Sequence, residues 1–299
     1  MLEHIVLYTS DVHGNEKQLR AFAEHAVEIG AQTIILGGEI APKDAPFEAY
    51  IRVQRDFLSV TLPGMLSDLK RSLPQSNIFV AMGNDDASAN RDVLGGHPEI
   101  YTDLHGQRVG LNGDFDIVGY SCVPITPFGI KDWEKFDLSN IPRKLAKAYR
   151  QRKKENYRLR GGIMSSPTLQ WMPFDFSRED ETRDSIQTDL LSEVYCRNPA
   201  RTVYVFHAPP SDSALDVVRN GQHVGSYAVR EFIEKYQPYL TLHGHIHETV
   251  DMSHGKFTNQ IGNTVSMSAG NHNRDDYVSA LVFNLYVPNA AQRIKLRCR

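Results

Sequence analysis

Cysteine is scarce in this chain of 299 residues. Its three cysteines, Cys122, Cys196 and Cys298, stand far apart and form no C-x-x-C pair. Disulfide frameworks need several paired cysteines and an oxidising compartment, so this usage argues against such a framework. We therefore expect a protein of the reducing cytoplasm.

Long hydrophobic runs are also lacking. None approaches the roughly 20 apolar residues that a membrane-spanning helix requires. The first predicted strand begins by residue 4, which leaves no room for a signal peptide. The formal net charge of −3 gives no overall reason to expect a nucleic acid or a membrane surface as partner. These absences predict a soluble intracellular protein.

Five short apolar runs are the main positive feature, because each is followed by a residue that can bind a metal. Runs of this length, rich in Val, Ile and Tyr, predict buried strands. They occupy residues 5–8, 33–36, 78–82, 203–206 and 239–242. Functional sites in open α/β sheets lie beyond the carboxyl ends of the strands, so we expect the residues that follow these runs to meet in one site.

Strand and helix patterns alternate over the first 100 residues, which predicts parallel strands with right-handed crossovers. Asn15 can cap a helix whose apolar residues recur at helical spacing until Gly30, a typical residue for a helix C-terminus. A second helical stretch covers about residues 47–73 and is expected to break at Pro63-Gly64.

Residues 128–200 differ from the rest, being polar and interrupted by Gly, Ser and Pro. We interpret the chain as a single domain, residues 1–299, with an insertion or cap at about 128–200. Residues 143–160 hold nine Lys or Arg against one acid, and residues 175–193 hold seven acids against two arginines. This predicts a solvated basic helix face paired with the acidic segment.

The side chains at the strand ends are carboxylate, amide and imidazole groups, which are suitable ligands for two divalent ions. Two such ions lower the pKa of water and clamp the attacking and leaving oxygens of a phosphate ester. Asp11 alone could be a turn residue, His207 a core histidine and Glu39 a salt-bridged carboxylate. The predicted ligands are Asp11, His13, Glu39, Asn84, His207, His245 and His247.

The order of these motifs resembles the calcineurin-like metallophosphoesterase superfamily. The motifs are D-x-H at 11–13, G-G-E at 37–39, G-N at 83–84, a histidine at 207 and G-H-x-H at 244–247. The wider phrases G-G-E-I-A-P at 37–42 and H-A-P-P at 207–210 look like the branch called Icc-related predicted phosphoesterases, as does H-V-G-S at 223–226.

This resemblance implies a fold of two mixed β-sheets packed face to face, with helices on both outer faces. Asp11, His13 and His247 would hold one ion. Asn84, His207 and His245 would hold the other, and Glu39 would lie between them. The implied enzyme is a binuclear hydrolase that cleaves a phosphomonoester or phosphodiester with a metal-bound hydroxide. Manganese or iron fits the thiolate-free ligand set best, and zinc is the third choice.

Two positions depart from the family pattern. Glu39 stands where the bridging ligand is usually aspartate, and Asp85 stands where a histidine usually assists the leaving group. The predicted catalytic groups are Asp85, which takes the position of that histidine, and His243, because alternation along a strand puts residues 243, 245 and 247 on one face. The predicted substrate-binding residues are His223, Asn271, His272 and Arg274.

We expect a small-molecule or nucleotide phosphoester as substrate, with no membrane partner. A nuclease is the first alternative, with residues 143–160 contacting the phosphate backbone. Tyr149 and Tyr157 are the only aromatic residues interleaved with that basic stretch, which argues against the alternative. The second alternative is a metal-binding interaction protein with weak or no turnover.

Overall fold

Two mixed six-stranded sheets form the centre of the computed structural model, which describes residues 2–299. The first sheet has the order β16-β15-β1-β2-β3-β4. Strands β1 to β4 are parallel to one another, whereas β15 is antiparallel to both of its neighbours, β1 and β16. Its strands are β1 (Ile5–Thr9), β2 (Thr33–Gly37), β3 (Asn77–Ala81), β4 (Thr102–Asp103), β15 (Tyr277–Asn284) and β16 (Gln292–Arg297).

The second sheet has the order β13-β14-β12-β11-β6-β5, with parallel pairing from β14 through β6. Its edge strands β13 and β5 are antiparallel to their neighbours. The strands are β5 (Arg108–Gly110), β6 (Asp116–Tyr120), β11 (Thr202–Phe206), β12 (Leu240–His243), β13 (Thr258–Ile261) and β14 (Thr264–Ser268).

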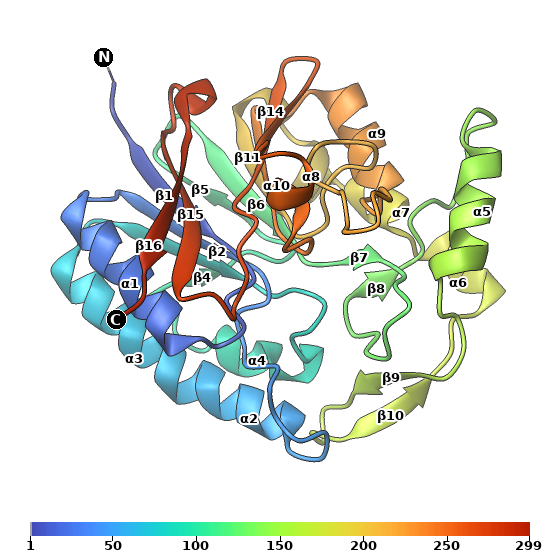
Figure 1. Cartoon of the computed structure of the whole chain (residues 1–299), viewed down its shortest axis with the longest axis horizontal. Coiled ribbons are helices and arrows are strands. Elements are labelled where there is room, and N and C mark those ends of the chain that lie inside the picture. Colours follow the sequence, from blue (N-terminus) through green and yellow to red (C-terminus); the bar gives the residue numbers. More distant parts are fainter. Residues whose placement is uncertain (1) are drawn as a thin grey trace.

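The two sheets pack face to face and helices cover their outer sides. Val6, Ile35 and Phe79 of the first sheet share one buried cluster with Val205 and Leu242 of the second. In Figure 1, α1 (Glu16–Glu28), α2 (Tyr50–Asp56) and α3 (Leu62–Ser72) lie outside the first sheet, whereas α7 (Ile186–Leu190) and α9 (Tyr227–Tyr236) lie outside the second. The predicted fold of two mixed sheets with helices on both outer faces is confirmed.

Helix α1 follows the sequence prediction. The side chain of Asn15 accepts a hydrogen bond from the backbone N–H of Gln18, which satisfies one of the free donors at the helix start. Gly30 follows the helix with a φ of +61°, a left-handed conformation that glycine adopts without steric cost.

The predicted break at Pro63-Gly64 is wrong. A π-helical turn (Phe57–Thr61) joins α2 directly to α3, and Pro63 is the second residue of α3. Within this turn the N–H of Leu62 donates to the carbonyl of Phe57, five residues back. The wider π turn accommodates a residue that cannot donate, so the helix continues past Pro63.

Residues 123–200 form short elements that arc away from the second sheet (Figure 1). The ring of Trp171 stacks on Phe47 with 5.6 Å between centroids, so the hairpin of β9 (Gly162–Ser165) and β10 (Trp171–Phe174) reaches back to the loop before α2. Within residues 2–299, two ion pairs join the basic and acidic stretches, Lys153–Glu181 and Arg160–Asp175. The elements are β7 (Val123–Pro124), β8 (Glu134–Lys135), α5 (Ala146–Asn156), β9 (Gly162–Ser165), β10 (Trp171–Phe174), α6 (Arg178–Arg183), α7 and α8 (Glu193–Cys196).

The remaining helical elements among residues 2–299 are α4 (Arg91–Leu94), α10 (Thr249–Met252) and three 3-10 helices at Ser88–Asn90, Pro199–Arg201 and Pro288–Ala290. Among residues 2–299, no helix combines the length and the apolar character needed to cross a membrane.

Candidate metal centre

The predicted ligands converge at the carboxyl ends of strands from both sheets. Those after β1, β2 and β3 come from the first sheet, and those after β11 and β12 come from the second. The strands end together because they are parallel within each sheet, which places the loops on one edge. Asp11, His13, Glu39, Asn84 and His207 are each at most 5% exposed, so this edge is a buried polar cluster.

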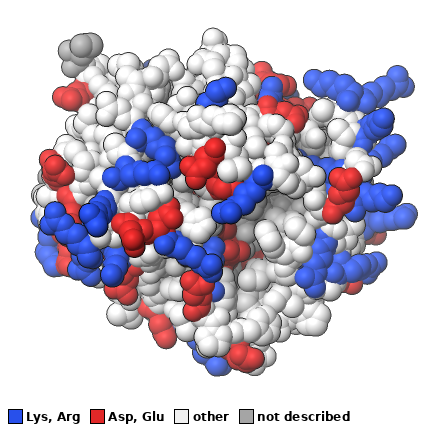
Figure 2. Space-filling model, viewed as in Figure 1, with Lys and Arg blue, Asp and Glu red and all other residues white. Residues whose placement is uncertain are grey.

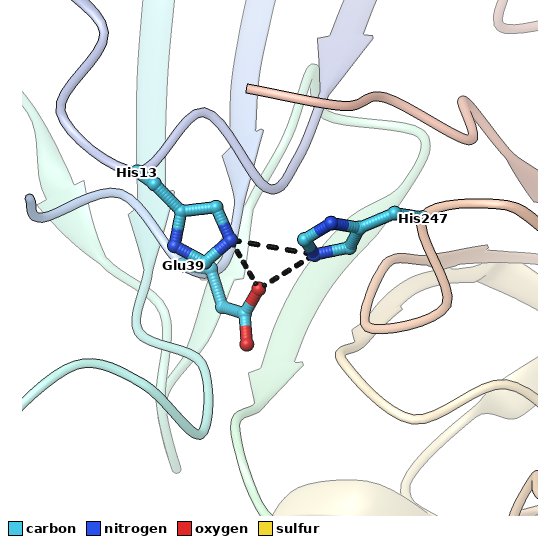
Figure 3. A group of neighbouring side chains, drawn as sticks. All are labelled: His13, Glu39 and His247. Carbon is cyan, nitrogen blue, oxygen red and sulfur yellow. Dashed lines mark hydrogen bonds and ion pairs between the residues drawn. The ribbon is translucent and has the colours of Figure 1, made fainter. Parts of the chain in front are cut away.

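The first group consists of His13, Glu39 and His247, which point toward one another (Figure 3). Glu39 Oε2 lies 2.8 Å from Nε2 of His13 and 3.0 Å from Nε2 of His247. The two imidazole nitrogens are 3.3 Å apart. Three potential ligand atoms from three different loops therefore surround one small volume.

The second group consists of Glu39, His207 and His245, whose ligand atoms all lie within 4.8 Å of one another. His207 Nε2 is 3.7 Å from Glu39 Oε1, the oxygen that the first group leaves free. The His207 and His245 ring centroids are 5.5 Å apart. Glu39 thus belongs to both groups and directs one oxygen toward each.

Asp11 and Asn84 flank these two groups. Asp11 accepts hydrogen bonds from the Ser10 hydroxyl at 2.6 Å and from the His245 backbone N–H at 3.0 Å. Its Oδ1 is also 3.8 Å from His247 Nε2. The side-chain oxygen of Asn84 is buried and accepts no hydrogen bond from any described residue, whereas its Nδ2 donates to Asp85.

The backbone of this cluster is strained. Asp11, His13, Glu39 and His245 have φ angles between +45° and +70°, a region that residues with a side chain rarely occupy. Such strain costs of order 1–3 kcal/mol per residue and is concentrated at functional sites. The surrounding structure must hold these four residues in place against that cost.

The glycines of the motifs allow close approach. A Cβ atom at Gly38 would lie 2.4 Å from His207 Nδ1, and one at Gly83 would lie 2.5 Å from both Glu39 Cγ and His207 Nε2. Any side chain at either position would occupy the space of a predicted ligand. The G-G-E and G-N motifs therefore have a steric cause in this structure.

Electrostatics bind the cluster together. Burial alone would raise the pKa of Glu39, but its contacts with His13, His207 and His247 hold that pKa well below its usual value. Burial disfavours a protonated His207, yet Glu39 and Asp11 raise its pKa to about 9. Glu39 is therefore ionised, and it attracts positive charge to the imidazoles around it.

The residues present fit a metal ion. His207 Nε2 and Asn84 Oδ1 are buried ligand atoms that have no hydrogen-bond partner among residues 2–299. Unpaired buried polar atoms are costly, and a cation between them and Glu39 would satisfy both. Carboxylate, amide and imidazole donors without thiolate suit divalent ions such as manganese, iron or zinc.

The two predicted catalytic residues are placed differently. Asp85 lines a cleft at the ligand cluster together with Glu39 and Asn84, and burial raises its pKa to about 6. His243 is fully buried, with Nδ1 donating to the carbonyls of Phe206 and Ala208 and Nε2 bonded to the Thr241 hydroxyl. Strand β12 ends at His243, so the assumed alternation stops there and His243 does not join the cleft.

The predicted substrate-binding residues are spread around the site. Nδ1 of His223 lies 2.7 Å from the buried carboxylate of Asp216. Asn271 is fully buried and donates to the Asp11 carbonyl at 3.3 Å, so it supports the loop and does not face the cleft. The ring of His272 is 5.5 Å from that of His247, whereas Arg274 is exposed near Asp44.

Three cleft residues were missed by sequence reasoning. A cleft of about 300 Å³ is lined by Lys43, Phe128 and Glu248 together with predicted ligands. The Lys43 ammonium lies 3.0 Å from His13 Nε2 and 3.9 Å from Asp85 Oδ2. Its position four residues after Glu39 in the same loop was the available signal. Phe128 gave no signal, because it stands in the irregular segment.

The sequence model of the calcineurin-like phosphoesterase family matches residues 5–249. The alignment with one solved structure covers 99% of this chain and 100% of the other chain, at 14% identity and with a TM-score of 0.58. The alignment with the crystal structure of TT1561 of Thermus thermophilus covers 99% of this chain and 100% of the other chain, at 16% identity and with a TM-score of 0.55. At such identities the likeness is one of fold. No curated protein matched the chain.

Proposed function

Because this chain belongs to the calcineurin-like phosphoesterase family, and so to the metal-dependent phosphoester hydrolases, we propose that its strand-end cluster is a binuclear active site. The observation that carries the proposal is the position of Glu39. Its carboxylate is shared by two groups of converging imidazoles, one on each side. A shared carboxylate between two ligand sets is what a two-ion site requires.

In this proposal each ion has its own ligand set. Asp11, His13 and His247 hold the first ion, whereas Asn84, His207 and His245 hold the second, with Glu39 common to both. When bound, the ions would lower the pKa of a water molecule and withdraw charge from the phosphoryl oxygens. Manganese or iron suits the mixed oxygen and nitrogen ligands, and zinc is the third choice.

Other side chains of the cleft position the substrate. The Lys43 ammonium is a fixed positive charge that would meet a phosphoryl oxygen. Asp85 lines the same cleft and is the proposed proton donor to the leaving group. Residues 128–200 are the proposed cap over the site. Phe128, from this segment, forms one wall of the cleft and limits the access of water.

Metal content and hydrolysis test the proposal together. The purified chain would be analysed for metals and assayed with phenyl phosphate and a bis-aryl phosphodiester, with manganese, iron or zinc added. His207→Ala and Asn84→Ala should each lose an ion and more than about 100-fold of the rate, because even residues that only support a ligand cost 10–100-fold.

His97→Ala is the matched control, because His97 is half-buried near Glu99 and away from the cleft. It should keep the metal content and rate of the unaltered chain. If both ligand variants retain two ions and full activity, the assignment of the site is wrong.

A nuclease is a second candidate, which the charge of α5 favours. Figure 2 shows Lys and Arg gathered at the right-hand side of the molecule, over this helix. The exposed basic residues of α5 are Lys147, Arg150 and Lys154, and Arg143 and Lys144 precede the helix. Binding to single-stranded DNA that falls steeply with salt would support a nuclease, and salt-independent or absent binding would exclude it.

A further inference from the structure

A second cavity of about 290 Å³ lies beside the candidate metal centre. It shares Phe128, His245 and Glu248 with the metal cleft, so a molecule bound at the metals can extend into it. Its remaining walls are largely apolar, including Ile125 and Val224. A cavity of roughly 150 Å³ holds a benzene molecule, so this one has room for a ring and a small substituent.

Arg152 brings a positive charge to this apolar cavity. It lines the cavity from α5 and is 9% exposed, whereas its neighbours Arg150 and Lys154 face solvent. Its guanidinium lies over the Tyr227 ring at 5.3 Å. One guanidinium nitrogen, Nη2, donates to the carbonyl of Val224, whereas Nη1 is buried and has no hydrogen-bond partner in the described part of the chain.

No carboxylate pairs directly with Arg152 within residues 2–299. Asp137 is near enough for Arg152 to offset part of the burial that raises its pKa. However, both oxygens of Asp137 accept hydrogen bonds at the start of α9, from Ser226, Tyr227 and Ala228. A buried charge without a bonded counter-ion is costly, so this arginine is suited to a ligand that brings one.

We infer that the cavity binds the organic group of the phosphoester and that Arg152 recognises an oxyanion on that group. The substrate class is a phosphoester of a ring-sized apolar group that carries a carboxylate or a second phosphate. The inference rests on the proposed function, since it places the ester phosphate at the metal centre. A guanidinium can donate to either oxyanion, and Nη2 of Arg152 is already bonded to the Val224 carbonyl, so its other N–H groups are the ones left for a ligand.

Matched aryl esters test the inference. Phenyl phosphate would be compared with 4-carboxyphenyl phosphate and 4-phosphonophenyl phosphate, which separate a carboxylate from a phosphate-like group. We expect kcat/KM to favour at least one charged ester over phenyl phosphate by about tenfold or more, the size of a hydrogen bond to a charged group. Arg152→Met should abolish the preference while phenyl phosphate is still hydrolysed.

Arg150→Met is the control, because Arg150 is an exposed arginine on the same helix. It should keep the preference, and Arg152→Lys should restore part of it. Replacing a buried charge by an apolar side chain of similar size is often tolerated, and thermal melting would check this. An Arg152→Met variant that keeps the full preference would overturn the inference.

Binding supplies a readout that needs no turnover and no variant. The full chain, before and after manganese is added, would be titrated with benzoate and with its neutral analogue benzamide. Benzoate should bind at least about tenfold more tightly. Equal affinity, or no binding of either, would overturn the inference. If no ester is hydrolysed with any metal, the proposed function fails, and the titration still decides what the cavity binds.

Discussion

At the scale of single residues, Lys43 is a charged group of the cleft that the family motifs do not contain. Its ammonium lies 3.0 Å from His13 Nε2, within the cleft that the predicted ligands line. We expect Lys43→Met to lower kcat/KM for phenyl phosphate by about tenfold or more, because a charge-assisted contact to the phosphoryl group is lost. Metal stoichiometry should stay unchanged.

Lys17→Met is the matched control, because Lys17 is exposed on α1 and should leave the rate constant unaltered. A Lys43→Met variant with the full rate would show that the cleft does not use this charge. A variant that loses metal would instead make Lys43 a support for the ligands.

His105 makes the stability of the fold depend on pH. Its ring packs against Trp133, its Nδ1 accepts from the Ser121 N–H at 3.0 Å, and burial lowers its pKa to about 3. In the unfolded chain His105 takes up a proton near pH 6.5, whereas in the folded chain it stays neutral at that pH. This residue therefore stabilises the fold fully above pH 6.5, and its contribution is lost as the pH falls toward 3.

His105→Asn isolates that effect, because an amide oxygen can replace Nδ1 as acceptor but does not titrate. Between pH 8 and pH 5, the free energy of unfolding of the unaltered chain should fall by about 2 kcal/mol more than that of the variant. Urea denaturation at the two pH values measures the difference. Buried carboxyl groups titrate equally in both proteins, so only the difference between the two reports on His105. An equal loss of unfolding free energy in both proteins would contradict the assignment.

At the scale of elements, Asp137 ties the 123–200 segment to α9. This fully buried carboxylate accepts from the Ser226 hydroxyl and from the N–H groups of Tyr227 and Ala228. Free N–H groups at a helix start favour negative charge. Asp137→Ala should therefore lower the free energy of unfolding by about 2–4 kcal/mol, measured in urea.

The exposed Asp175 provides the comparison, since it pairs with Arg160 at the surface. Asp175→Ala should leave the unfolding midpoint unchanged within error. If Asp137→Ala also left the unfolding midpoint unchanged, the contacts of Asp137 at the start of α9 would make no net contribution to the free energy of unfolding.

The strand ends were predictable from sequence because their patterns are local. A run such as residues 33–37 is apolar enough to identify a buried strand, and its carboxyl end fixes where Glu39 emerges. The two-sheet architecture came from the family resemblance, because strand patterns such as those of β14 and β15 do not tell which sheet a strand joins. Pairing across the two sheets depends on contacts between distant residues, which spacing does not encode.

Other features depend on tertiary context that a linear pattern lacks. Arg152 stands in a run of basic residues, and only the packing of α5 shows that it is the buried one among the basic residues of this helix. His243 fell outside the cleft because β12 ends there and His245 turns to a φ of +70°. The π turn before Pro63 likewise arises from packing, not from a sequence signal.

At the scale of the whole molecule, the candidate site is assembled from both sheets. Asp11, His13 and Glu39 follow strands of the first sheet, whereas His207 and His245 follow strands of the second. An ion bound between them would add a further connection between two halves that also meet through the apolar cluster between the sheets. Metal binding and global stability should therefore be coupled.

That coupling predicts a higher melting temperature when metal is present. A ligand at 100 times its dissociation constant stabilises the folded state by about 2.7 kcal/mol, which corresponds to several degrees for a chain of this size. Scanning calorimetry in EDTA and then in manganese should show the rise for the unaltered chain. His207→Ala removes a ligand from the second sheet and should show a clearly smaller rise, while His97→Ala should match the unaltered chain.

Identical melting temperatures with and without manganese, iron or zinc would mean that the cluster does not bind these ions at the concentrations used. The same rise in His207→Ala would mean that the ion binds elsewhere, without joining the two sheets.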